Sequence, residues 1–218
     1  GWLAGQRAPD RVPLLTGLEA ARPSEDGLKA LCAAFGTTSG SPLLHIRGIT
    51  PEGDLPPRTD ATMTRIARHD FETLWHRFNS APQAIDLVSI GSPHASLAEL
   101  RALAGLLKGR HVAQDVSLVI TAGRDTITAA KAHGTYATLT GAGVTILGDL
   151  CWCSIVEPVM PASVRTLMTN SGKYAHYAPG LSGRAVRFGS LADCAHAAVT
   201  GQAPAAPPGW LVQGEIAR

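Results

Sequence analysis

Residues 169–180 read TNSGKYAHYAPG and bring hydroxyls, a carboxamide, an amine, two phenols and an imidazole into one short segment. Apolar runs at residues 164–168 and 184–188 flank this segment, and each run is typical of a short buried strand. A polar segment that contains glycine and follows a buried strand is typical of a ligand site at the end of a sheet. We therefore expect residues 169–180 to form a loop that carries functional groups between two strands.

The sequence around this segment alternates between short apolar runs and amphipathic runs. The further elements that this pattern predicts are strands at residues 85–90, 115–121 and 144–147 and helices at residues 97–107, 124–140 and 191–199. Such alternation is typical of an open, mostly parallel α/β sheet with helices on both faces. We expect this fold class.

The first third of the chain shows a less regular pattern. Ser24 precedes two acidic residues and an apolar stripe, which predicts an N-cap and a helix over residues 25–35. We expect Cys32 to lie on the apolar face of this helix as a core thiol. A strand is expected over residues 42–49 and a helix from residue 60 or 61 to residue 78, with a proline-rich linker between them.

These patterns predict three parts of the chain. Residues 1–57 are expected to end a preceding α/β unit, residues 58–200 to form an α/β domain, and residues 201–218 to form an irregular tail rich in alanine and proline. The sequence opens without an initiator methionine, so we expect the chain to be a portion of a longer polypeptide.

The composition is that of an ordinary globular protein. The chain has 218 residues, of which 45% are hydrophobic and 17% charged, and its formal net charge is +2. That charge is too small, and the basic residues too scattered, to favour nucleic acid or an anionic membrane as a partner. The four cysteines do not form the framework of a small secreted domain, and we expect a reducing, cytoplasmic setting.

Polar side chains follow each of the central predicted strands. The four segments are residues 91–96, 121–126, 148–153 and 169–177. The carboxyl ends of parallel strands meet at one edge of a sheet, and open α/β sheets bind ligands there. The sequence therefore predicts that these four segments converge on one site.

Each side chain at this edge also has a purely structural interpretation. The hydroxyls fit turns and helix caps, the imidazole and the amine fit exposed surface, and a spacing of two does not match a Cys-x-x-Cys signature. The residues concerned are Ser92, His94, Ser96, Arg124, Asp125, Cys151, Cys153 and Lys173. Their convergence on one edge favours a functional site over eight separate structural roles.

Several of these motifs resemble the aconitase X family. They are GSPHASL at residues 91–97, DLC at 149–151, MTNSGKYAHYAPG at 168–180 and VRFGSLADC at 186–194, together with FGTT at 35–38 and HIRGITPE at 45–52. The resemblance covers nearly the whole chain. It implies an aconitase-like fold, an iron–sulfur-dependent hydro-lyase, and a chain that is the later half of the large catalytic portion. The preceding half and a small swivelling domain would then be partners, either fused or on a separate chain.

The resemblance also implies the class of substrate, a small hydroxy acid or hydroxy imino acid. Known members dehydrate cis-3-hydroxy-L-proline or mevalonate 5-phosphate. We expect dehydration of cis-3-hydroxy-L-proline to Δ1-pyrroline-2-carboxylate, because Ser92 and the pair that follows Cys151 resemble the bacterial type. Mevalonate 5-phosphate dehydration remains the alternative. A non-catalytic regulatory or ligand-binding subunit remains an alternative of another class.

The resemblance suggests roles for individual residues. Cys151 matches a cluster-ligand position, and an iron–sulfur cluster of the [2Fe–2S] type would act as Lewis acid for the departing hydroxide. Relatives often carry cysteine where this chain has Ser92, so that ligand would come either from Cys153 or from the missing half of the protein. The chemistry of the side chains suggests Ser171, Lys173 and His94 as catalytic residues and Asn170, Gly172, Ser92 and His176 as substrate-binding residues. Either Ser171 or His176 could serve as the base, and the resemblance to aconitase favours Ser171.

Overall fold

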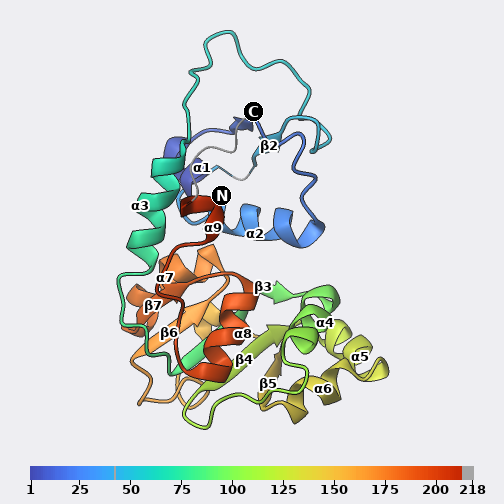
Figure 1. Ribbon diagram of the computed structural model, residues 1–218. Coiled ribbons are helices and arrows are strands. Elements are labelled where there is room, and N and C mark those ends of the chain that lie inside the picture. The colour runs from blue at the N-terminus through green and yellow to red at the C-terminus, as the bar shows by residue number, and fades with distance from the viewer. Residues whose placement is uncertain (42, 213–218) are drawn as a thin grey trace.

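The computed structural model describes residues 1–41 and 43–212, and its larger part is built on a five-stranded sheet (Figure 1). The strands are β3 (Leu87–Ala95), β4 (Ser117–Ala122), β5 (Val144–Gly148), β6 (Thr166–Thr169) and β7 (Ala185–Phe188). They are all parallel and lie in the order β5-β4-β3-β6-β7. The chain winds outward from β3 to β5 and then returns to the other side of β3. The winding therefore reverses between β3 and β6, the position where open α/β sheets bind ligands.

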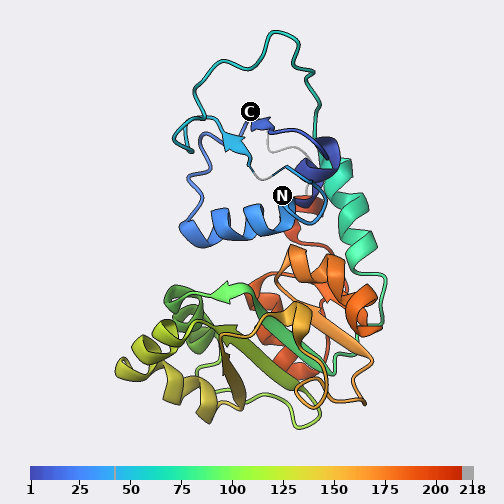
Figure 2. The same cartoon turned by 180° about the vertical axis from the view of Figure 1, so that it is seen from behind.

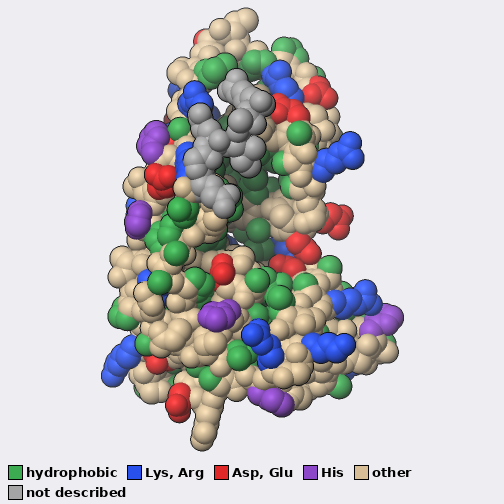
Figure 3. Space-filling view, viewed as in Figure 1, with side chains coloured by type: hydrophobic (Ala, Val, Ile, Leu, Met, Phe, Trp, Pro, Cys, Tyr) green, Lys and Arg blue, Asp and Glu red, His purple; other side chains and the backbone are tan. Residues whose placement is uncertain are grey.

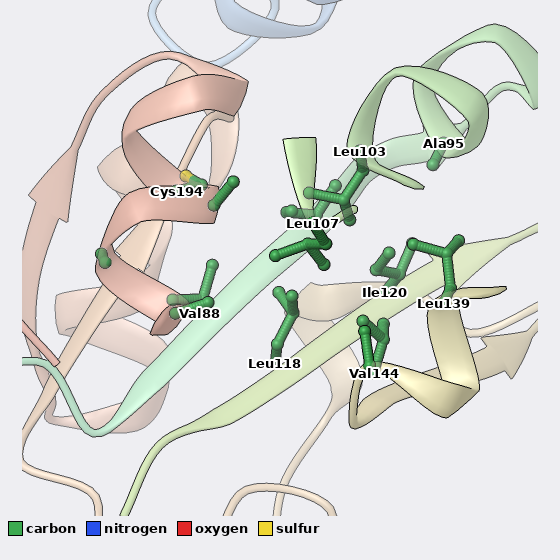
Figure 4. Packing of buried hydrophobic residues seen from close by; sticks show 14 of the residues in the cluster. Val88, Ala95, Leu103, Leu107, Leu118, Ile120, Leu139, Val144 and Cys194 are labelled. Carbon is green, nitrogen blue, oxygen red and sulfur yellow. The ribbon is translucent and has the colours of Figure 1, made fainter. Parts of the chain in front are cut away.

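Successive side chains along the strands enter two different cores. Leu87, Val119 and Leu167 pack into one cluster with the helix α7 (Gly172–Ser182). Their neighbours Val88 and Leu118 pack into the other cluster with the helices α4 (Leu97–Leu106), α6 (Thr135–Gly141) and α8 (Leu191–Thr200) (Figure 4). Burial of each such leucine contributes about 1.5–3 kcal/mol. The expectation of an open, mostly parallel α/β sheet with helices on both faces is confirmed.

The helix predicted over residues 124–140 is two helices. α5 (Arg124–Ala132) ends before Gly134, and α6 begins at Thr135. Gly134 has a φ of +75°, a conformation that ends a helix and that glycine adopts without steric cost. The apolar periodicity continues across the break, which is why the sequence pattern suggests a single helix.

The expectation of a loop over residues 169–180 is wrong from residue 172 onward. Ser171 is the N-cap of α7, because its Oγ accepts a hydrogen bond from the Tyr174 backbone N–H at 3.0 Å. Tyr174, Ala175 and Ala178 are buried and form the helical stripe that packs on the sheet. Pro179 lies inside this helix and does not end it.

The first part of the chain forms a small layer above the carboxyl edge of the sheet. It contains α1 (Trp2–Arg7), α2 (Glu25–Phe35), α3 (Arg68–Phe78) and the paired strands β1 (Leu14–Leu15) and β2 (His45–Ile46). Figures 1 and 2 show α2 lying across the end of β3, and α2 contacts both β3 and α7. This layer therefore covers the edge where the winding of the sheet reverses.

Several expectations for this layer need correction. The strand predicted over residues 42–49 is reduced to β2, and Pro42 lies outside the described residues. The second helix begins only at Arg68, where the Asp70 carboxylate accepts a hydrogen bond from the Ala67 N–H. Cys32 is exposed and is not a core thiol, because α2 turns Ala34 and Phe35 inward instead.

The tail contains a short helix, α9 (Gly209–Val212), where irregular structure was expected, and residues 213–218 lie outside the described residues. No helix within the described ranges is long and apolar enough to cross a membrane.

Candidate functional site

A small cavity lies where α2 meets the carboxyl edge of the sheet, between the ends of β3 and β6. Its walls come from α2 (Lys29, Ala30), the end of β3 (Gly91, Ser92, Pro93), α4 (Glu99) and the start of α7 (Asn170, Ser171, Gly172). Its volume is about 20 Å³, enough for about one water molecule. Figure 3 shows the molecule hollowed between the sheet and the small layer that contains α2, called the α2 layer below, with acidic side chains at the rim.

The backbone at Gly91 brings Ser92 into this cavity. The pairing of β3 with β4 loses its register after Ile90 and resumes at Ala95. Gly91 bends the strand with a φ of +101°, and a Cβ there would lie 2.1 Å from the Thr121 carbonyl oxygen. Ser92 is 5% exposed, and its Oγ has no hydrogen-bond partner among the described residues. A buried hydroxyl without a protein partner is uncommon, and the adjacent cavity has room for a water molecule or a ligand group that would hydrogen-bond to it.

Ser171 faces Ser92 across the cavity from the end of β6. Its Oγ donates a hydrogen bond to the Ser92 carbonyl oxygen and accepts one from Tyr174 N–H. Thr169 Oγ1 accepts a hydrogen bond from the Ser171 N–H at 3.2 Å. The Ser171 oxygen therefore lies at the amino end of α7, where the helix dipole stabilises negative charge.

Gly172 allows α2 to approach the start of α7. A Cβ on Gly172 would lie 3.2 Å from the Ala34 Cβ, which is tighter than ordinary packing. A larger side chain here would separate α2 from the sheet and open the wall of the cavity.

Lys29 is a site residue that sequence reasoning missed. Its Nζ donates hydrogen bonds of 2.9 Å to the His94 carbonyl oxygen and to the carboxylates of Asp26 and Glu99. Ser96 Oγ donates to the other Asp26 oxygen at 2.7 Å. These contacts join α2 to the end of β3 across 65 to 70 residues of sequence. The only local signal is the i,i+3 pair of Asp26 and Lys29, which also fits an exposed helix surface.

In this network, the positive charge of Lys29 and the negative charges of Asp26 and Glu99 stabilise each other's ionised forms. Burial by itself would lower the pKa of Lys29, but hydrogen bonds to Asp26 and Glu99 outweigh burial and raise the pKa above its ordinary value. Burial would likewise raise the pKa of Asp26, but hydrogen bonds from Lys29 and Ser96 outweigh it and lower that pKa. Lys29 is therefore a firmly cationic group at the wall of the cavity.

His94 forms a hydrogen bond with the segment that follows β5. His94 Nε2 lies 2.9 Å from the Leu150 carbonyl oxygen, and this nitrogen must carry a proton because a carbonyl only accepts. Asp149 adopts a φ of +58°, and its carboxylate accepts hydrogen bonds from Arg124 N at 3.0 Å and Arg124 Nε at 2.5 Å. These contacts fix the segment that leads into Cys151.

Cys151 and Cys153 flank a buried tryptophan in a 3₁₀ turn, η1 (Trp152–Ser154). Trp152 Nε1 donates to the Ile90 carbonyl oxygen at 2.8 Å, and its ring lies 5.3 Å from the Tyr174 ring. Burial and the neighbouring Cys151 thiol raise the pKa of Cys153, and Lys173 acts in the opposite direction. Both thiols and Lys173 therefore gather at the same edge of the sheet.

His176 lies away from the small cavity. Its Nδ1 accepts a hydrogen bond from Trp2 Nε1 at 3.0 Å, and its side chain lines a different cavity near α3. Of the expected site residues, Ser92, Asn170, Ser171 and Gly172 line the cavity, and His94, Lys173 and Cys151 lie at the same sheet edge. The structure does not bring His176 to this group.

The described residues contain no group of three or more His, Cys, Asp or Glu side chains placed to hold a metal ion. Cys151 and Cys153 nevertheless fit two ligands of an iron–sulfur cluster, because their thiols are adjacent and a cation would offset the effects that raise the pKa of Cys153. The chain thus holds part of a possible ligand set.

Models of two domains of one protein family match this chain. Residues 1–76 match the aconitase X second domain, and residues 85–200 match the aconitase X third domain. The chain belongs to the aconitase X family. The aconitase X from Thermococcus kodakaraensis, whose crystal structure is of the holo form, superposes with a TM-score of 0.78 at 30% identity. The superposition covers 93% of this chain and 50% of that one.

Curated aconitase X relatives include enzymes of two names. Cis-3-hydroxy-L-proline dehydratases of Pseudomonas aeruginosa and Hypocrea jecorina are 44% and 42% identical over 97% of this chain. The phosphomevalonate dehydratase large subunit of Methanosarcina mazei is 30% identical over 93% of this chain. The chain spans 37% of the length of the first two relatives and 48% of the third.

Proposed function

We propose that the complete protein is a hydro-lyase that converts cis-3-hydroxy-L-proline to Δ1-pyrroline-2-carboxylate. The observation that carries this proposal is the convergence of Ser92, Ser171 and Lys29 on one cavity at the point where the winding of the sheet reverses. Identities of 44% and 42% to dehydratases of that name support this substrate over mevalonate 5-phosphate. We further propose that the protein acts in the cytoplasm together with the remaining portion of the polypeptide.

Ser171 is the proposed base for the α-proton. Deprotonated Oγ keeps the hydrogen bond from Tyr174 N–H and faces the positive end of the α7 dipole, and both lower the cost of an alkoxide. The hydrogen bond that Oγ donates to the Ser92 carbonyl is given up in that state. The α-proton converts Ser171 back to a hydroxyl, and release of that proton to solvent restores the base for the next turnover.

Cationic and amide donors around the cavity are the proposed carboxylate site. Asn170 lines the cavity, and Lys173 at the same edge supplies a positive charge. A carboxylate prefers such charge-assisted hydrogen bonds over neutral ones. The three N–H donors of Lys29 are already used by the His94 carbonyl, Asp26 and Glu99, so Lys29 holds α2 in place and does not bind the carboxylate. The cavity of about 20 Å³ is too small for the imino acid, so we propose that α2 moves away from β3 when substrate enters.

His94 is the proposed acid for the departing hydroxide. Its Nε2 proton is engaged by the Leu150 carbonyl, so the imidazolium form would deliver the proton from Nδ1. Cys151 and Cys153 would hold an iron–sulfur cluster, with further ligands from the remaining portion of the enzyme. When bound, the cluster would supply Lewis acidity that weakens the carbon–oxygen bond.

The test is turnover by the complete, cofactor-loaded enzyme purified without oxygen. Cis-3-hydroxy-L-proline and mevalonate 5-phosphate are compared at equal concentration, and the product is followed by mass spectrometry. We expect loss of one water from the imino acid and no reaction of the phosphorylated alcohol. The opposite result would assign the chain to the phosphomevalonate branch. Binding of the imino acid without turnover of either compound would favour a ligand-binding subunit.

A further inference from the structure

A second cavity lies at the seam between α3, α7 and β7, and it shares no lining residue with the first. Its volume is about 370 Å³, within the range of roughly 300–1,000 Å³ that small-molecule pockets occupy. Figures 1 and 2 place this seam beside α3, on the β7 side of the sheet. The cavity is therefore large enough to hold a small molecule.

Two arginines supply positive charge to this cavity. Arg77 comes from the end of α3 and Arg184 from the turn before β7. Within the described residues neither guanidinium forms an ion pair, and no acidic residue lines the cavity. The Arg77 guanidinium carbon lies 4.9 Å from the centre of the Trp2 ring, a cation–π contact that restricts where this charge lies. Two unpaired guanidiniums in one cavity favour an anion.

His176 adds a third hydrogen-bond donor. Its Nδ1 accepts a hydrogen bond from Trp2 Nε1, so the ring proton of the neutral form resides on Nε2. Burial, assisted by the nearby Arg77 charge, lowers the pKa of His176 and favours this neutral form. The polar groups that the three side chains present are therefore donors rather than acceptors.

The wall that carries Arg77 is fixed to the sheet. Arg187 of β7 is 4% exposed, and its Nη1 donates to the carbonyl oxygens of Asn79 at 2.7 Å and Ala81 at 2.8 Å. The Phe188 N–H donates to Asn79 Oδ1 at 3.1 Å. These bonds tie the loop after α3 to β7, so the cavity is formed before any ligand arrives. A preformed site loses less entropy on binding than a flexible one.

We propose that this second cavity binds a small carboxylate with an apolar body. The guanidinium groups and His176 Nε2 would receive the carboxylate. Phe78, Pro179 and Val186 line the same cavity and would contact the apolar part. A bare inorganic anion would leave these apolar walls uncovered. This proposal rests on the cavity alone and is independent of the reaction proposed above.

The test is isothermal titration calorimetry of the complete, cofactor-loaded enzyme with benzoate as the probe. Arg77→Gln and Arg184→Gln each remove one cationic donor, and we expect each to raise the Kd for benzoate about tenfold or more. Arg165→Gln changes an exposed arginine outside the cavity, and Lys29→Met changes the first cavity. We expect both of these control variants to bind benzoate as the wild type does.

Arg77 is exposed, so Arg77→Gln keeps the test valid even where Arg184→Gln lowers the melting temperature. Absence of any benzoate binding would overturn the proposal, as would unchanged affinity in Arg77→Gln. Loss of binding in Lys29→Met would place benzoate in the first cavity and would also overturn it. Inorganic phosphate that binds as tightly as benzoate would refute the requirement for an apolar body.

Discussion

At the residue scale, the candidate site depends on Gly91, where the backbone conformation and the close packing leave no room for a side chain. Gly91 has a left-handed φ and lies against the Thr121 carbonyl, and this bend turns Ser92 into the cavity. Thr121 Oγ1 also donates to the Gly91 carbonyl oxygen at 2.7 Å. The motif around Ser92 was visible in the sequence, but the steric reason for its glycine was not.

Gly91→Ala is therefore expected to destabilise the protein strongly. The new Cβ would lie 2.1 Å from a backbone oxygen, a clash that only a shift of β3 or β4 relieves. We expect a loss of several kcal/mol in the free energy of unfolding, measured by urea titration, because strain and overpacking add. Gly105→Ala is the matched control. No atom lies within 4 Å of a Cβ at this exposed position in α4, so a gain of about 0.5–1 kcal/mol is expected.

Lys29→Met tests the network between α2 and the sheet. The three groups are only partly buried, so we expect a loss of about 1 kcal/mol at neutral pH. The Asp26 pKa is lowered below 3.8 on folding, so its contribution is present above that pH and is lost as the pH falls through the folded value. The Lys29 pKa is raised above 10.5, so its contribution is lost as the pH rises through the folded value.

The difference in the free energy of unfolding between wild type and Lys29→Met should therefore be largest at pH values between the folded-state pKa values of Asp26 and Lys29. It should become smaller below the first and above the second. Urea titrations at several pH values measure this difference. Lys108→Met, at an exposed position, should show no such dependence. A difference that stays constant from acid to alkaline pH would contradict the role of the charged network.

At the scale of elements, the first turn of α7 lies at the candidate site and the rest of the helix packs in the core. Ser171 caps the helix and faces the cavity, while Tyr174 and Ala178 bury the next two turns. The sequence showed the polar residues and suggested a loop. The buried stripe of Tyr174, Ala175 and Ala178 is a weaker signal than the run of polar groups around it, and the pattern therefore did not indicate a helix.

Ser171→Ala should reduce both stability and activity. Loss of the cap is expected to cost about 1 kcal/mol, and loss of the proposed base should lower kcat about 100-fold or more. Ser190→Ala is the matched control, because Ser190 Oγ accepts the Asp193 N–H at 3.1 Å as the cap of α8. It should cost similar stability with kcat unchanged. Steady-state kinetics and thermal unfolding of the complete enzyme check both variants. If kcat of Ser171→Ala stays within about twofold of the wild-type value, Ser171 caps the helix but is not the base.

At the scale of the whole molecule, the candidate site lies between two layers of this chain. The α2 layer covers the carboxyl edge of the sheet, and the adjacent thiols of Cys151 and Cys153 reach the same edge. The chain spans 37% of the length of its dehydratase relatives, so other parts of those proteins are available to supply further ligands.

Cys151→Ser should lower the iron and labile sulfide content of the complete enzyme purified without oxygen. Removal of one thiolate weakens the binding of the cluster, and the visible absorbance should fall with the iron content. Cys32→Ser changes an exposed thiol of α2 and should leave iron, sulfide and spectrum unchanged. Equal iron contents in wild type and Cys151→Ser would remove Cys151 from the ligand set.

Local patterns in the sequence predict the alternating strands and helices, the parallel sheet and the convergence of four polar segments on one edge. These features follow from local periodicity and from caps such as Ser24 and Ser96, whose partners lie three residues away. Cys32, Lys29 and His176 show where that reasoning ended. Which face of α2 is buried, and which cavity a side chain of α7 reaches, depend on how the layers pack.

The contacts that cross those layers depend on tertiary packing and have no local signal in the sequence. Lys29 meets Glu99 across 70 residues, and Trp2 meets His176 across 174 residues, and neither pair leaves a periodic signal in the sequence. Such contacts form when the apolar faces of helices and strands pack together. This packing also fixes which neighbouring polar side chains come into contact. The second cavity arises in the same way, where the Arg187 bonds hold α3 against the edge strand of the sheet.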